Sequence, residues 1–97
     1  MLAELTHTHF EPHVGSIFDL ELNDTERLPL RLIEVQTSAH GGAAARRSFS
    51  LIFRSDLPGV LPQAIYRLDH PAMGALGLFI VPIGRDAVGT QYQAIFG

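Results

Sequence analysis

Short stretches in which apolar and polar residues alternate recur along the chain, and they constrain its fold more than any other feature. The clearest is RSFSLIFR (47–54), where Phe49, Leu51 and Phe53 alternate with serine, isoleucine and arginine. A two-residue period puts successive side chains on opposite faces of a β-strand. Since no helical period is sustained, the sequence predicts strands at residues 16–22, 30–37, 47–54, 64–70, 75–83 and 90–96.

Turn residues separate these predicted strands. In HPAMG (70–74), Pro71 presets one backbone angle of a tight turn and Gly74 is free to adopt a positive φ. The Gly/Ala-rich stretch 38–46 predicts a long, mobile loop. Six short strands at this spacing predict a mainly β fold, with one antiparallel sheet arranged as a small barrel or a sandwich. The length of 97 residues suits one domain, 1–97.

Two of the predicted strands depart from simple alternation. LRLIEVQT (30–37) has adjacent apolar residues at Leu32 and Ile33, which indicates a β-bulge or a strand buried on both faces. ALGLFIVPI (75–83) is apolar along both of its faces. Strands that are buried on both sides have such continuous apolar runs, so this strand is predicted to run under another layer of structure.

One short helix is predicted, at about residues 6–14. Thr6 is a favourable N-cap, and Leu5 can contact Phe10 as a hydrophobic staple. Gly15 is placed to end the helix with a positive φ. The apolar residues of this segment would then cover an open end or face of the sheet; they are Leu5, Phe10 and Val14.

The same segment holds the best candidates for a metal site, namely His7, His9, His13 and Glu11. At 100° per residue, His9 and His13 share one helix face, while His7 and Glu11 lie almost opposite. A single helix therefore cannot bring the three imidazoles together. The zinc-protease pattern also needs a glutamate directly after the first of two histidines, and the sequence has none there. These four residues are weak metal candidates, and the sequence predicts no cofactor.

Other chemistry is less well supported. The absence of cysteine excludes disulfides, thiolate nucleophiles and sulfur-ligated metals. No Gly-x-Ser-x-Gly elbow is present, and strand alternation puts Asp69 and His70 on opposite faces. The net charge of −3 disfavours nucleic acid, since the densest basic run is Arg46-Arg47. The sequence therefore predicts no catalytic residues, no enzymatic activity and no nucleic-acid binding.

The composition points towards a protein partner. Charged residues make up 18% of the chain, against about 25% in ordinary domains, and the mean hydropathy is +0.18. A chain this small cannot bury all of its apolar residues unless some strands are covered on both faces. Residues 1–34 are rich in carboxylates and residues 35–67 in arginine. These charges either complement one another between subunits or meet across neighbouring strands of one chain.

The sequence predicts no cleavable export signal and no membrane-spanning segment. No window approaches 18 consecutive apolar residues, and the N-terminal sequence MLAELTHTHF has neither a basic region nor an apolar region of a cleavable signal. The expected location is therefore the cytoplasm, with export by a signal-independent route left open.

Three stretches resemble a family of small bacterial proteins known only as a domain of unknown function. They are LTHTHFEPHVGSIFDL (5–20), RSFSLIFRSDLPGVLPQAIYRLDHPAMGALGLFIVPIG (47–84) and QYQAIF (91–96). The most specific part is the run LPQAIYRLDHP…LGLFIVPIG. The family carries no assigned activity, so the resemblance transfers no catalytic residue. An association with phage-tail-collar-like genes would imply an accessory or assembly role.

These observations favour a non-enzymatic protein-interaction or assembly module, as an accessory subunit of a phage-tail-like or surface structure. Its partner would be another protein or further copies of the same chain. The alternative is a small-molecule-binding or metal-dependent small β-barrel that uses the N-terminal histidines. A toxin-neutralising or chaperone-like role is indistinguishable from the first hypothesis by sequence.

Overall fold

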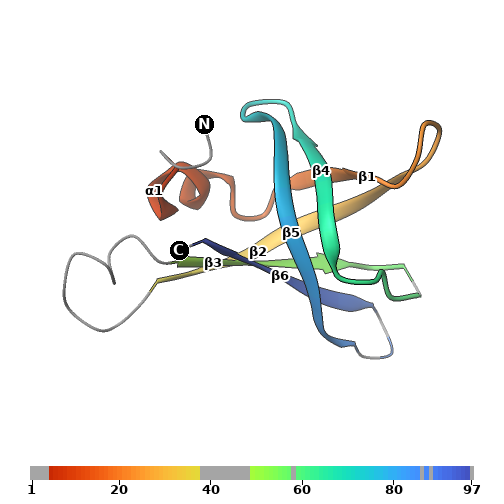
Figure 1. The fold of residues 1–97 in the computed structure, drawn as a ribbon. Helices are drawn as coiled ribbons and strands as arrows, with labels where there is room; N and C mark the ends of the chain where they lie inside the picture. Colours follow the sequence, from red (N-terminus) through yellow and green to blue (C-terminus); the bar gives the residue numbers. More distant parts are fainter. Residues whose placement is uncertain (1–4, 38–48, 58, 86, 88, 97) are drawn as a thin grey trace.

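Six antiparallel strands close into a barrel in the computed structural model, which describes residues 5–37, 49–57, 59–85, 87 and 89–96. The neighbours around the barrel follow the order β1-β2-β3-β6-β5-β4, and a short helical segment covers one end (Figure 1). The mainly β fold with one N-terminal helical segment is confirmed, and of the two predicted arrangements it is the barrel. The elements are α1 (His7–Phe10), η2 (Glu11–His13), β1 (Ile17–Glu21), β2 (Arg27–Thr37), β3 (Phe49–Ser55), β4 (Ala64–His70), β5 (Gly74–Arg85) and β6 (Thr90–Phe96).

Two long strands, β2 and β5, allow the sheet to curl into a barrel. The first part of β2 pairs with β1 and its second part with β3, while β5 passes in the same way from β4 to β6. The register shifts between Leu32 and Glu34 in β2, and between Pro82 and Gly84 in β5. Such bulges bend a strand and increase its twist. The bulge predicted at Leu32 and Ile33 is therefore confirmed.

Strand β2 begins at Arg27, three residues before the predicted start at residue 30. The prediction was wrong because the preceding residues NDTERLP (23–29) are polar and end in a proline, which is typical of a loop that ends at Pro29. Pro29 pairs with Asp19 of β1, whereas Leu32 donates its backbone N–H to the Ser16 carbonyl. Antiparallel pairs alternate between bonded and non-bonded positions, so Pro29 occupies a position where no ladder hydrogen bond is required.

The other predicted strands are found close to their expected positions. Strands β4 and β6 match the predicted 64–70 and 90–96, while β1 and β5 differ from the prediction by one or two residues at their ends. The turn at Gly74, which has a φ of 77°, is also confirmed. The predicted loop at 38–46 and the start of the predicted strand 47–54 lie outside the described residues.

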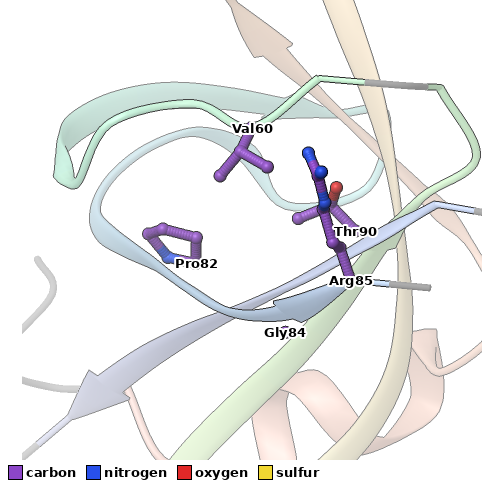
Figure 2. A pocket seen from close by; sticks show the side chains of 5 residues that line it. All are labelled: Val60, Pro82, Gly84, Arg85 and Thr90. Atoms are coloured by element: carbon purple, nitrogen blue, oxygen red, sulfur yellow. The ribbon is translucent and has the colours of Figure 1, made fainter.

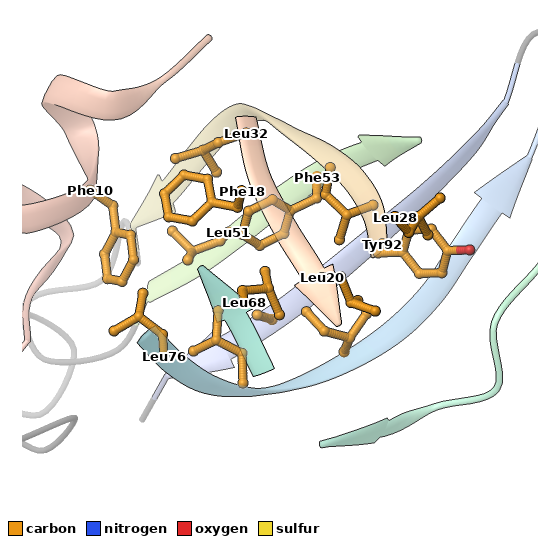
Figure 3. Packing of buried hydrophobic residues seen from close by; sticks show 14 of the residues in the cluster. Phe10, Phe18, Leu20, Leu28, Leu32, Leu51, Phe53, Leu68, Leu76 and Tyr92 are labelled. Atoms are coloured by element: carbon orange, nitrogen blue, oxygen red, sulfur yellow. The ribbon is translucent and has the colours of Figure 1, made fainter. Parts of the chain in front are cut away.

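The core is a row of buried side chains along the inside of the barrel, and Figure 3 shows Phe10 at one end of it and Tyr92 at the other. The inward faces of the strands alternate as predicted, with Phe18 of β1 packing edge-on against Phe53 of β3. Strand β5 is buried on one face only, because Phe79 is 50% exposed on the other. The prediction that this strand runs under a further layer is therefore wrong. Its outward apolar residues face solvent.

The segment α1–η2 forms a lid on the barrel, as predicted. Thr6 is the N-cap, and His9 rather than a glutamate completes the capping box by accepting the Thr6 backbone N–H. Phe10 is fully buried against Phe49 and Phe96, with ring centroids 5.8 and 5.4 Å apart.

The lid ends differently from the single helix that was predicted. After Phe10 it tightens into the 3₁₀ turn η2, which has Pro12 at its start. Gly15 then adopts a φ of 96°, as expected, and its N–H donates to the Leu32 carbonyl. Val14 lies in an extended conformation and is 46% exposed, so it does not help to cover the barrel. No helix among the described residues is long and apolar enough to span a membrane.

Candidate functional site

The three N-terminal histidines have three different neighbours. His7 Nδ1 lies 3.2 Å from Glu11 Oε2, which agrees with the predicted pairing of these two residues. His9 Nδ1 accepts the Thr6 N–H at 2.9 Å and is part of the helix cap. His13 lies in η2, with its ring 4.6 Å from that of His70. Within the described part of the chain, no three histidine or carboxylate side chains are grouped so that they could hold a metal ion.

The structure instead brings together Ser16 and His70, which are 54 residues apart in the sequence. His70 Nε2 lies 3.0 Å from Ser16 Oγ, and Ser16 Oγ donates to the His13 carbonyl at 2.6 Å. On the other side of the ring, His70 Nδ1 accepts the backbone N–H groups of Ala72 and Met73 at 3.0 and 3.3 Å. His70 thereby joins the β4–β5 turn to the end of the lid.

A serine and a histidine at this distance have the spacing of a nucleophile and its base. The hydrogen bonds argue against that chemistry, because Nδ1 accepts two N–H groups and must be unprotonated. The proton of neutral His70 therefore lies on Nε2 and is donated to Ser16 Oγ, so this nitrogen cannot accept the hydroxyl proton. Burial lowers the pKa of His70, and the nearby His13 imidazole lowers it further. The hydrogen bond between His70 and Ser16 therefore has a structural role, which is to connect the β4–β5 turn to the end of the lid.

Sequence reasoning missed this connection. His70 flanks the β4–β5 turn, and its Nδ1 accepts the backbone N–H groups of the turn as an aspartate or asparagine oxygen often does. Nothing in the sequence points from His70 to Ser16, because their contact depends on how β1 and β4 meet. Asp69 and His70 do point to opposite faces, as strand alternation predicted.

An ion-pair network lies on the outside of the barrel where β1 meets β4. Among the described residues only Asp19 and Leu20 of β1 pair with β4 there. Across this seam, Arg27 of β2 contacts Asp69 of β4, and Asp69 also accepts a hydrogen bond from Arg67 Nε at 3.1 Å. Hydrogen bonds from Arg27 and Arg67 lower the pKa of Asp69. None of these pairs joins a carboxylate of residues 1–34 to an arginine of residues 35–67, so the pairing expected between those two segments stays a prediction.

A second surface feature lies beside this network, on the outward side of strands β4 and β5. Ile65 and Phe79 are directly paired across the two strands, and they are 75% and 50% exposed. Their neighbours on the same side are small or charged. We call this surface the β4–β5 face; it consists of Ile65, Arg67, Ala75, Gly77 and Phe79.

An open pocket of about 210 Å³ lies at the bulged end of β5, and Figure 2 shows the five residues that line it. Val60 and Pro82 form apolar walls, with the guanidinium of Arg85 across from them (Figure 2). Thr90 is buried at the base, and its hydroxyl donates to the Gly59 carbonyl at 3.2 Å. Apolar walls with one cationic group suit a small ligand that has an apolar body and a negative charge.

Comparison with known proteins supports the resemblance drawn from the sequence. The family model described as Domain of unknown function (DUF6916) matches residues 5–96. The chain belongs to this family. The match to DUF6916 begins at Leu5, ahead of the lid, and ends with β6, so it includes the lid and every strand of the barrel. No curated protein and no solved structure matches the chain.

Proposed function

We propose that this protein is a non-enzymatic assembly module that associates with a second copy of itself through the β4–β5 face. The observation that carries this proposal is the adjacent pair Ile65 and Phe79, both largely exposed on a strand surface. Large apolar side chains that are adjacent on an exposed strand surface are typical of a surface that another protein covers. The donor arrangement at Ser16 and His70, which leaves no base for the hydroxyl, supports a role without catalysis.

The shape of the face favours a second copy as the partner. Phe79 and Gly77 lie two residues apart on β5, so a bulky side chain and a position without one are neighbours on the same side. A methyl group added at Gly77 would come no closer than 4.0 Å to Ile65, which leaves a shallow space there. A two-fold axis between these positions would put each Phe79 over Gly77 of the other copy. Equivalent contacts of this kind are the basis of symmetric dimers.

The charges beside the face also suit a second copy. Arg27 and Arg67 are engaged by Asp69 and Glu21 of the same chain, so the network largely compensates itself. Two such surfaces can approach without strong repulsion, whereas a highly charged partner would find little to complement it. The apolar surface of two large side chains is on the order of a few hundred Å² per copy, below the standard ~800 Å². We therefore expect a weak contact that is strengthened when many copies assemble.

A repeating structure is the setting in which such a contact would be used. The family resemblance suggested an accessory subunit of a phage-tail-like or surface structure. In that setting, neighbouring subunits hold the chain at high local concentration, and a weak contact between copies is then sufficient.

The test is sedimentation velocity over concentrations from low micromolar to millimolar, with the wild type and Phe79→Arg. The wild type should change from monomer to dimer as its concentration rises, and Phe79→Arg should remain monomeric because its guanidinium would be buried over Gly77 of the other copy, beside Arg67 of that copy. The matched control is Leu57→Arg, since Leu57 has the same 50% exposure but lies outside the face. A wild type that stays monomeric at millimolar concentration, or a dimer unaffected by Phe79→Arg, would overturn the proposal.

The pocket supports a second candidate function, the binding of a small amphiphilic anion. Arg85 makes no ion pair within the described residues and faces the apolar walls formed by Val60 and Pro82. This version of the small-molecule hypothesis does not use the N-terminal histidines. Octanoate is a suitable probe, because its carboxylate can pair with Arg85 while its chain fills the pocket. Saturable shifts of the Val60 methyl signals that are lost in Arg85→Gln would support it. Shifts that persist in Arg85→Gln would count against it.

A further inference from the structure

His70 connects the lid, the barrel and the β4–β5 turn. Its ring is 4.4 Å from that of Phe18 in the core and 4.6 Å from that of His13 in η2. Through Ser16 it reaches the His13 carbonyl, and through Nδ1 it holds the N–H groups of Ala72 and Met73. The two hydrogen bonds at Nδ1 require a neutral imidazole with its proton on Nε2.

Protonation of His70 would break its contacts on the turn side of the ring, whereas the Nε2–H that donates to Ser16 is present in both forms. A proton on Nδ1 would remove the acceptor that the N–H groups of Ala72 and Met73 use, and would put donors face to face. The ring is only 7% exposed, so a positive charge there would also be poorly solvated. His13 would become a like charge at short range if it were protonated as well. With the lid closed on the barrel, His70 therefore stays neutral at a pH at which it would be protonated if the lid were open.

The charged groups of Asp69 and Arg31 also lie near the lid, and the contact made by Arg31 works against release at every pH. Asp69 is next to His70 in the chain but points outward to Arg27 and Arg67. Arg31 of β2 donates to the Gly15 carbonyl at 3.0 Å and holds the end of the lid at any ordinary pH. β1 and the turn contribute no titratable group that faces the ring, so His13 is its titratable neighbour within the described structure.

One pair on the lid has the opposite tendency. A protonated His7 would attract Glu11 and favour the helical turn at low pH. The side chains of His7 and Glu11 are 32% and 51% exposed, so solvent and salt reduce this attraction.

We propose that His70 is a proton-sensitive latch, which releases the lid from the barrel in mild acid while the barrel itself stays folded. Release would withdraw Phe10 from its place against two rings that stack on each other, Phe49 and Phe96, whose centroids are 4.5 Å apart. The opened lid would expose this aromatic end of the barrel. The protein then has an apolar surface that is available at low pH and covered at neutral pH.

Amide hydrogen exchange, corrected for its intrinsic pH dependence, tests the latch. The reporters are the N–H groups of Gly15 in the lid and Ala72 in the turn, with the amides of β3 as an internal measure of global unfolding. One proton taken up on opening makes the protection of Gly15 and Ala72 fall about tenfold per pH unit below about pH 6.5. The amides of β3 should remain protected to a much lower pH than those of Gly15 and Ala72. His70→Asn should abolish the slope, because an amide oxygen can hold the turn but does not titrate.

Several results would overturn the latch. Protection at Gly15 that is flat between about pH 7.5 and pH 5 in the wild type would contradict it. Loss of protection of the β3 amides at the same pH as the lid amides would also contradict it, because such a parallel loss indicates global unfolding. His7→Asn is the matched control and should keep the wild-type slope. If His70→Asn does not fold, histidine NMR of the wild type decides: the His70 ring signals must titrate with the same midpoint as the Gly15 amide.

Discussion

Replacing Phe10 with alanine tests whether the lid is an integral part of the barrel. The Phe10 side chain is fully buried and contacts the rings of Phe49 and Phe96. Truncation of a buried phenylalanine costs about 3–5 kcal/mol of folding free energy, because the transfer energy is lost and a cavity remains. A domain of this length has about 5–15 kcal/mol in all. The variant should therefore keep its fold but with a large part of its stability lost.

Thermal unfolding followed by circular dichroism measures this loss. At about 4–8 °C per kcal/mol for a domain of this size, Phe10→Ala should lower the melting temperature by at least about 12 °C. Val14→Ala is the control on the same segment; the Val14 side chain is half exposed, so its truncation should cost no more than about 0.5 kcal/mol. A decrease below about 4 °C for Phe10→Ala would refute the account of the lid, since it would mean that the barrel end does not depend on this ring.

Three further substitutions test other parts of the structure. Gly89→Ala should prevent normal folding or lower the melting temperature severely, because a Cβ there would lie 1.9 Å from the Ser55 carbonyl oxygen; a melting curve like the wild type would contradict this. Tyr92→Phe should cost about 1–3 kcal/mol in urea denaturation, since it leaves the Leu61 N–H without its 3.1 Å acceptor. Asp69→Asn should cause a small, salt-sensitive loss of stability at neutral pH and none in strong acid. The folded-state pKa of Asp69 is depressed, so its contribution is present above the ordinary value near 3.8 and disappears as the pH falls through the folded value.

Much of this fold follows from local patterns in the sequence. The alternation in 64–70 and 90–96 coincides with β4 and β6, and the adjacent pair Leu32 and Ile33 marks the bulge in β2. Pro29 was misread because a loop and a non-bonded strand position tolerate proline for the same reason, the absence of a required N–H. The outward side of β5 was misread because apolar residues on both faces indicate burial only where another layer exists.

The candidate site was less predictable than the fold. Helical phase correctly paired His7 with Glu11, but the grouping of His13 with His9 assumed one continuous helix, and α1 ends at Phe10, so the His13 ring lies beside His70. The contact of Ser16 with His70 depends on the closure of the barrel between β1 and β4, and no local pattern encodes that meeting. The exposure of Ile65 and Phe79 depends on the same closure of the barrel, because the closure determines which face of each strand lies outside.

Chemical-shift mapping by dilution tests the central claim, self-association through the β4–β5 face, most directly. Amide spectra of the uniformly ¹⁵N-labelled wild type are compared between millimolar and low micromolar protein at constant pH and salt. We predict concentration-dependent shifts confined to residues 64–70 and 74–81, centred on Ile65, Gly77 and Phe79, and absent in Phe79→Arg. Spectra that do not change with concentration, or shifts centred on the lid or the pocket, would contradict the claim.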